Sequence, residues 1–123
     1  MATKKEVTKI LVIEDEGDIC LLLELLLAGR KTIIDHVHTL TDAKEFIGRD
    51  QPTLVLLDNR LPDGLGIDFI GFLKQEYPGI KIIMITGADG IAEDAVLATG
   101  ADRFISKPFT QGQLQASIDQ VLN

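Results

Sequence analysis

The sequence predicts an α/β fold in which a parallel sheet carries helices on both faces. Short apolar runs alternate along the chain with longer segments of mixed polarity, and three of the runs are apolar at every position: Ile10–Ile13, Leu54–Leu57 and Ile82–Ile85. Runs of this kind are typical of strands that are covered on both faces. Because helical segments separate these strands, the alternation favours a parallel sheet.

Five strands and five helices are expected. Phe104–Ile105 is predicted to be a short strand, and Thr32–His38 a weaker strand at an edge of the sheet because of its polar residues. The helices are predicted at Asp18–Ala28, Thr41–Gly48, Gly66–Tyr77, Ile91–Thr99 and Thr110–Leu122.

Capping residues stand near the ends of several predicted helices. Thr41 and Thr110 lie where helix N-caps belong, since a threonine side chain can accept a hydrogen bond from the first turn. Gly29, Gly79 and Gly100 lie where helices are expected to stop.

Composition and charge narrow the classes of function. The 123 residues, of which 46% are hydrophobic, fit one domain spanning residues 1–123. Twelve basic residues against nineteen acidic ones argue against direct binding of nucleic acid. The single cysteine cannot form an internal disulfide, and the longest apolar run, LLLELLLAG, is interrupted by Glu24 and too short to span a membrane. We therefore expect a cytoplasmic protein that does not insert into a membrane.

Polar residues gather where the predicted strands end. Glu14 and Asp15 follow the first strand, Asp58 ends the third, Thr86 ends the fourth and Lys107 follows the fifth. Functional groups of open parallel sheets lie beyond the carboxyl ends of the strands. If the first and third strands are neighbours, three carboxylates converge at one edge, and the threonine and the lysine approach from the other side.

These residue types suit the binding of a phosphoryl group. Clustered carboxylates repel each other unless a cation joins them, and their hard oxygens suit Mg²⁺. Lys107 supplies a positive charge and Thr86 a hydroxyl donor, so Asp58 can act as a nucleophile that forms an acyl phosphate. Two simpler interpretations remain: Asp58 only begins a loop, and Glu14 and Asp15 only open the first helix.

Four fragments of the chain match a known family. They are VIEDE at 12–16, LLDNRLPDG at 56–64, ITGAD at 85–89 and GADRFISKPF at 100–109. Together they resemble the receiver domain of bacterial two-component response regulators, and the resemblance runs from Ile10 to about Leu122. It implies a flavodoxin-like sheet in the order 2-1-3-4-5. It also implies a signalling phosphoacceptor, rather than an enzyme, that receives its phosphoryl group from a histidine kinase or a phosphotransfer protein.

The resemblance assigns a Mg²⁺ site and the residue that is modified. Asp58 matches the phosphoacceptor. Asp15 matches the acid that binds Mg²⁺ directly, and Glu14 matches its neighbour, which acts through water. The backbone carbonyl of Arg60 would be a further ligand, and the Arg60 side chain is expected to influence how long the phosphate persists.

The resemblance also assigns the residues that respond to phosphorylation. Thr86 matches the hydroxyl residue that contacts the phosphoryl group, and Lys107 matches the lysine that pairs with it. Phe104 stands where the family keeps an aromatic ring whose position reports the state. We expect Thr86 and Phe104 to move together, with the glycine-rich segment at 87–90 absorbing the backbone change.

Three further features need an interpretation. Leu21 and Leu25 exceed the single apolar stripe that a surface helix requires, so we expect an exposed patch that docks a kinase or a second copy. The alternative is that they pack under the last helix. His36 and His38 share a face of the edge strand, a spacing that permits metal binding, but without a third ligand we expect solvated histidines. Cys20 is expected to be an inert, small apolar residue.

Three other functions are disfavoured. A phosphohydrolase with an aspartate nucleophile carries a second acid two residues later, where this chain has Arg60, which cannot exchange protons. A flavodoxin-like nucleotide binder needs phosphate-binding amides and hydroxyls in its first loop, whereas EDEGD at 14–18 would repel phosphate. A degenerate receiver that acts only as a scaffold is disfavoured because every chemical position is filled.

Overall fold

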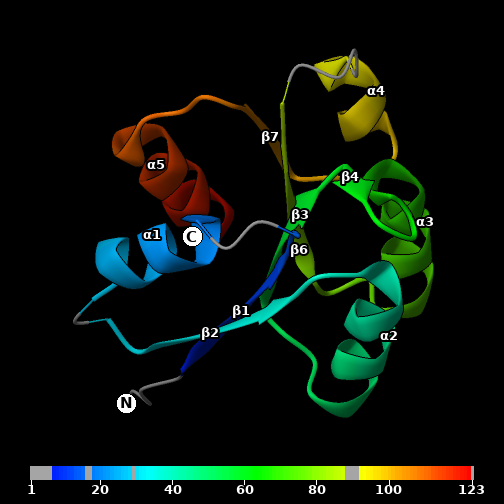
Figure 1. The fold of residues 1–123 in the computed structure, drawn as a ribbon, viewed down its shortest axis with the longest axis horizontal. Helices are drawn as coiled ribbons and strands as arrows, with labels where there is room; N and C mark the ends of the chain where they lie inside the picture. The colour runs from blue at the N-terminus through cyan, green and yellow to red at the C-terminus, as the bar shows by residue number, and fades with distance from the viewer. Residues whose placement is uncertain (1–6, 16–17, 29, 88–91, 123) are drawn as a thin grey trace.

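A computed structural model of the chain describes residues 7–15, 18–28, 30–87 and 92–122. Five parallel strands form a sheet between a layer of α1 and α5 and a layer of α2, α3 and α4 (Figure 1). The strands of this sheet are β1 (Thr8–Ile13), β2 (Thr32–Val37), β3 (Leu54–Asp58), β6 (Lys81–Thr86) and β7 (Arg103–Ser106). Two short strands, β4 (Arg60–Leu61) and β5 (Gly64–Leu65), form a separate pair. The helices are α1 (Asp18–Leu26), α2 (Leu40–Arg49), α3 (Gly66–Glu76), α4 (Glu93–Ala98) and α5 (Gln111–Leu122).

The strand order confirms the predicted architecture. The sheet runs β2-β1-β3-β6-β7, which is the order 2-1-3-4-5 once the small antiparallel pair β4–β5 is set aside. The apolar runs occupy the three central strands, and their side chains are buried on both faces. Leu11 and Ile13 pack toward α2 and α3, whereas Ile10 and Val12 pack toward α1 and α5. β2 lies at an edge, as its polar content predicted.

The helix starts were predicted correctly at α5 but not at α2. Thr110 Oγ1 accepts from the N–H of Gln113, whose side-chain oxygen accepts from the N–H of Thr110 in return. At α2 the N-cap is Thr39, whose hydroxyl oxygen accepts from the N–H of Asp42. Thr41 is already helical, and its own N–H and hydroxyl donate to the carboxylate of Asp63. The prediction of Thr41 as the N-cap was therefore wrong.

The helix ends also differ in part from the prediction. Gly100 follows α4 with a φ of 116°, a conformation that favours glycine, as expected. α3 ends before Pro78 rather than at Gly79, because the residue that precedes a proline is driven out of the helical region. Gly29 lies outside the described residues, as do residues 88–90 of the segment that we expect to absorb the backbone change on phosphorylation.

The extra leucines of α1 are exposed, which excludes the interpretation that they pack under the last helix. Leu23 and Leu27 provide the buried contacts with the sheet, whereas Leu21 and Leu25 are 61% and 68% exposed. Among the described residues, none of the helices is long and apolar enough to cross a membrane.

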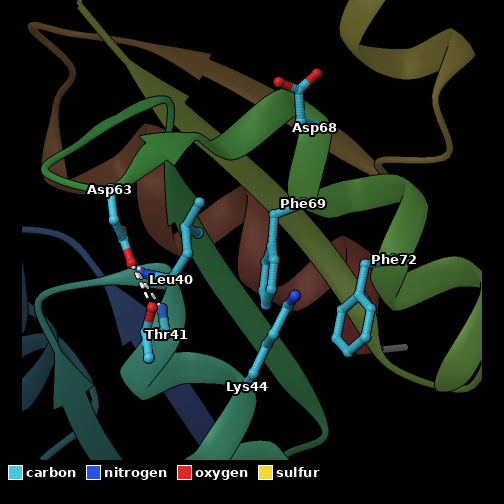
Figure 2. Close-up of a pocket in the computed structure, with 7 residues that line it drawn as sticks. All are labelled: Leu40, Thr41, Lys44, Asp63, Asp68, Phe69 and Phe72. Carbon is cyan, nitrogen blue, oxygen red and sulfur yellow. Dashed lines mark hydrogen bonds between the residues drawn. The ribbon is translucent and has the colours of Figure 1, made fainter.

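A short hairpin after β3 was not predicted, and it holds the start of α2. It consists of β4 and β5, and β4 begins two residues after Asp58. At its turn, the carboxylate of Asp63 accepts hydrogen bonds from the N–H of Leu40 at 2.8 Å, the N–H of Thr41 at 2.9 Å and the Thr41 hydroxyl at 2.8 Å (Figure 2). These hydrogen bonds lower the pKa of Asp63. With Thr39, the turn satisfies the first three N–H groups of α2.

We predict that Asp63→Ala lowers the thermal midpoint at pH 7, because two N–H groups of α2 lose their acceptor. The folded pKa of Asp63 lies below its unfolded value, so its contribution is complete above the ordinary aspartate pKa and is lost as the pH falls through the folded value. The melting temperatures of wild type and Asp63→Ala, measured across this pH range, should therefore become equal at acidic pH.

Asp63→Asn provides the matched control, because it keeps an acceptor oxygen without the charge. It should cost less stability than Asp63→Ala, and its own contribution should not vary with pH in this range. Melting curves of Asp63→Ala that stay equally far below wild type down to the lowest pH would contradict the assignment to the ionised carboxylate.

Candidate functional site

The sheet topology brings four of the predicted site residues together at the carboxyl ends of the strands. Asp58 is the last residue of β3, and Thr86 is the last residue of the neighbouring β6. Lys107 directly follows β7, and its N–H donates to the carbonyl of Thr86 at 2.8 Å, which joins the ends of β6 and β7. Glu14 follows β1 on the opposite side of β3.

The ammonium of Lys107 lies between two carboxylates. Its Nζ is 3.4 Å from Oε2 of Glu14 and 3.7 Å from Oδ2 of Asp58. Glu14 is only 3% exposed, and burial of a carboxylate without a countercharge is costly. One cation therefore lies near both acids, and on Asp58 it is closest to Oδ2.

The two oxygens of Asp58 have different partners. Oδ1 accepts a hydrogen bond from the N–H of Asn59 at 2.7 Å, whereas Oδ2 faces Lys107. Burial raises the pKa of Asp58, with the charge of Asp15 adding to the rise. Lys107 and the backbone N–H groups of Asn59 and Arg60 oppose this increase. The result is a half-buried carboxylate with one oxygen held and the other next to a positive charge.

Thr86 and Phe104 lie on the neighbouring strands β6 and β7. Thr86 pairs with Ser106, and Phe104 pairs with Met84, two residues before Thr86. Thr86 is buried, whereas Phe104 is half-buried and packs against the core on the side of α2 and α3. The register thus places the two predicted switch residues on neighbouring strands, two positions away from direct pairing.

His36 is linked to the site through the backbone. Its Nε2 lies 2.8 Å from the carbonyl oxygen of Glu14, and a carbonyl can only accept, so this nitrogen carries the hydrogen. The ring centroids of His36 and His38 are 4.6 Å apart. Among the described residues no third ligand joins them.

A cavity of about 250 Å³ lies elsewhere, between α2, the hairpin turn and α3 (Figure 2). Phe69 and Phe72 form its apolar wall, and the ammonium of Lys44 lies 4.8 Å from the ring centre of Phe72. None of the residues at the strand ends lines it. This cavity is therefore separate from the polar residues at the strand ends.

Comparisons with known proteins identify the arrangement. Residues 10–119 match the family model of the response regulator receiver domain. The chain belongs to this family. It is thus a receiver domain of the kind found in two-component systems, as the four sequence fragments indicated.

Curated relatives and solved structures agree with this assignment. The response regulator protein PilR of Pseudomonas aeruginosa is 35% identical over 116 residues, which cover 93% of this chain and 26% of PilR. The phosphate regulon transcriptional regulatory protein PhoB of Escherichia coli is 38% identical over 118 residues, 93% of this chain and 51% of PhoB. The chain thus spans between a quarter and a half of these relatives.

Two receiver structures show how closely the fold is shared. The signal receiver domain of a putative LuxO repressor protein from Vibrio parahaemolyticus superposes with a TM-score of 0.87 at 28% identity, covering 95% of this chain and 91% of that one. The N-terminal domain of the nisin resistance regulator NsrR superposes with a TM-score of 0.82 at 33% identity, covering 96% of this chain and 100% of that one.

The receiver's donor atoms fit a magnesium site with few protein ligands. Within the described ranges, no three His, Cys, Asp or Glu side chains are grouped so that they could hold a metal ion, and Asp15 is exposed. The three carboxylates predicted to converge thus do not form a closed cluster. Mg²⁺ keeps several waters and needs only one or two carboxylates. Asp15, Asp58 and the Arg60 backbone carbonyl supply oxygen donors of the type that this ion prefers.

Sequence reasoning missed one residue of the site. Asn59 is 2% exposed and forms the hydrogen bond to Oδ1 of Asp58 through its backbone. The available signal was a polar residue that directly follows four buried apolar positions and the acceptor. Its side-chain partner lies eight residues further along the chain, which no local pattern reveals.

We predict that Asp58→Asn raises the thermal midpoint of the receiver at pH 7. Because the folded pKa of Asp58 is raised, the folded state favours the protonated carboxyl. The destabilisation is therefore absent below the ordinary aspartate pKa and develops as the pH rises through the folded value. Melts at acidic pH should show little difference from wild type.

The control is Asp68→Asn, which removes the same charge at an exposed position of α3. It should give no comparable gain at pH 7. A midpoint for Asp58→Asn at or below that of wild type at neutral pH would show that the contacts of the ionised carboxylate outweigh its burial.

Proposed function

We propose that this receiver accepts a phosphoryl group on Asp58 from a phosphohistidine of a histidine kinase or a phosphotransfer protein. The observation that carries the proposal is the position of Oδ2, which faces the Lys107 ammonium at the end of a central strand while Oδ1 is held by a backbone N–H. This arrangement suits an aligned nucleophile beside a charge that stabilises the transferred group.

The reaction is a phosphoryl transfer between two protein side chains. A bond forms between Oδ2 of Asp58 and phosphorus, and the P–N bond of the donor imidazole breaks, with its electron pair returning to nitrogen. A proton on the donor ring makes the leaving group a neutral imidazole. The negative charge of the carboxylate is carried over to the acyl phosphate. Lys107 is the group of the chain that offsets this charge, and the Thr86 hydroxyl offers a hydrogen bond to a phosphoryl oxygen.

Mg²⁺ completes the proposed site. Asp15, Asp58 and the backbone carbonyl of Arg60 would hold it, with Glu14 acting through water. When bound, it supplies positive charge that offsets the repulsion between carboxylate and phosphate. The exposed side chain of Arg60 lies two residues from the acceptor, where it can cover the phosphate and prolong its lifetime.

The expected output is a change of surface around β6 and β7. A hydrogen bond from Thr86 to the phosphoryl group draws the end of β6 toward Asp58, and the neighbouring ring of Phe104 moves into the space that becomes free. Phe104 pairs with Met84, two residues before Thr86 on the neighbouring strand, so a shift of the end of β6 can reach both residues. The phosphate then changes the population of a conformation that the free receiver already samples.

We predict that incubation with a small phosphodonor and Mg²⁺ adds one phosphoryl group to the wild-type protein, as read by intact mass spectrometry. Asp58→Asn should not gain it, because an amide is not a comparable nucleophile. Asp15→Ala should need more Mg²⁺ for the same rate, since one ligand and one negative charge are lost.

Wild-type protein without Mg²⁺ is the matched control. Modification of Asp58→Asn at an undiminished rate would show that another residue is the acceptor. An unchanged Mg²⁺ dependence in Asp15→Ala would remove this residue from the metal site.

We also predict that Leu21 and Leu25 contact the phosphodonor protein or a second copy. Covering both exposed side chains contributes about 2–4 kcal/mol of hydrophobic free energy. Replacing both by Glu should leave the melting temperature nearly unchanged and weaken phosphotransfer from the cognate donor or self-association. Phosphorylation by the small donor should not change.

Leu97→Glu on α4 is the control for a charge introduced at another exposed leucine. Equal phosphotransfer to wild type and to the double variant, together with unchanged self-association, would exclude the patch as a contact surface. Unfolding of the double variant would show instead that the two leucines contribute to the core.

A further inference from the structure

The first turn of α3 is capped from a distance. Its own N-cap residue is Leu65, whose side chain has no acceptor and makes no capping hydrogen bond. The N–H of Ile67 instead donates to Oδ1 of Asn59 at 3.0 Å, and the N–H of Gly66 donates to the backbone carbonyl of Asn59 at 2.7 Å. One residue, six positions before the N-cap, thus satisfies two N–H groups that the helix itself cannot.

The same residue holds the acceptor carboxylate. The N–H of Asn59 donates to Oδ1 of Asp58 at 2.7 Å, and the whole residue is only 2% exposed. The helix start packs directly against the acceptor, because a Cβ at Gly66 would lie 2.2 Å from the carbonyl oxygen of Asp58. The first turn of α3 therefore holds the peptide between Asp58 and Asn59 in place, through hydrogen bonds to Asn59 and through close packing of Gly66 against Asp58. We call this arrangement the clamp.

We propose that Asn59 is a positioning residue for phosphorylation. By capping α3 it fixes its own N–H on Oδ1 of Asp58, so that Oδ2 is the oxygen presented to Lys107 and to the incoming phosphorus. The inference rests on Asp58 being the acceptor. The two oxygens of a carboxylate are chemically equivalent and the group rotates over a broad two-fold range, so such a clamp is what distinguishes them.

The chemistry of asparagine suits this role. An aspartate would cap the helix equally well, but it would bring another negative charge next to the acceptor and the phosphate. An apolar side chain would leave the N–H of Ile67 without its acceptor. A neutral acceptor satisfies both requirements.

The test separates positioning from helix stability. Asn59→Leu keeps the branched shape and the number of heavy atoms and removes the acceptor, whereas Leu65→Ser supplies a local N-cap at an exposed, extended residue. The two single variants, the double variant and wild type are compared by thermal melts and by the rate of phosphorylation with a small phosphodonor and Mg²⁺. Each rate is measured at a temperature where circular dichroism shows that all four proteins are folded.

We expect Asn59→Leu to lower both the melting temperature and the phosphorylation rate, the rate by about tenfold or more. The double variant should regain thermal stability and remain slow, while Leu65→Ser alone should react at the wild-type rate. Should Asn59→Leu fail to fold, Asn59→Ser replaces it, because its shorter side chain ends before the amide of Ile67.

Two outcomes overturn the inference. A double variant that reacts at the wild-type rate would show that Asn59 only caps α3. An unchanged rate in the folded Asn59 variant would show that the clamp does not affect the acceptor. A wild-type protein that gains no phosphoryl group on Asp58 would instead overturn the proposed function itself, so the two failures are distinguishable.

Discussion

A carboxylate partly buried at the end of a central strand is the constraint on which the site depends. β3 has a neighbouring strand on each side, so Asp58 is partly shielded from water, and this burial raises its pKa. The ammonium of Lys107 and the N–H groups of the following loop oppose this rise in the pKa. The same cation offsets the charge of Glu14, so both acids depend on the placement of β7.

The segment after the acceptor has a second role, since it caps two helices. Asp63 satisfies N–H groups of α2, and Asn59 satisfies those of α3. Helix N-caps are normally supplied by the residue that precedes the helix. At α2 the acceptor loop adds to the N-cap Thr39, and at α3 it replaces the capping side chain that Leu65 lacks. The starts of α2 and α3 are thereby fixed relative to Asp58, which couples the position of the acceptor to the helical layer on one face.

The exposed surface of the receiver is divided between two layers. α1 presents Leu21 and Leu25 on the layer that it forms with α5, while Phe104 packs on the opposite side of the sheet. The proposed donor contact and the proposed switch therefore lie on different faces. The predicted site residues lie at the strand ends, between these two faces. There the N–H of Lys107 joins the end of β7 to the end of β6.

The order of strands and helices and the residues at the strand ends could be predicted from the amino-acid sequence. Continuous apolar runs indicate strands buried on both faces, and in a parallel sheet their carboxyl ends meet at one edge. The three-dimensional structure was needed to show that Lys107 lies between Glu14 and Asp58 and that Asp15 is exposed. It was also needed to show that Asn59 and Asp63 cap α3 and α2. Lys107 and Glu14 are 93 positions apart, and Asp63 and Leu40 are 23 apart. Sequence patterns report burial and local hydrogen bonding, whereas these contacts exist only after the sheet has brought distant segments together.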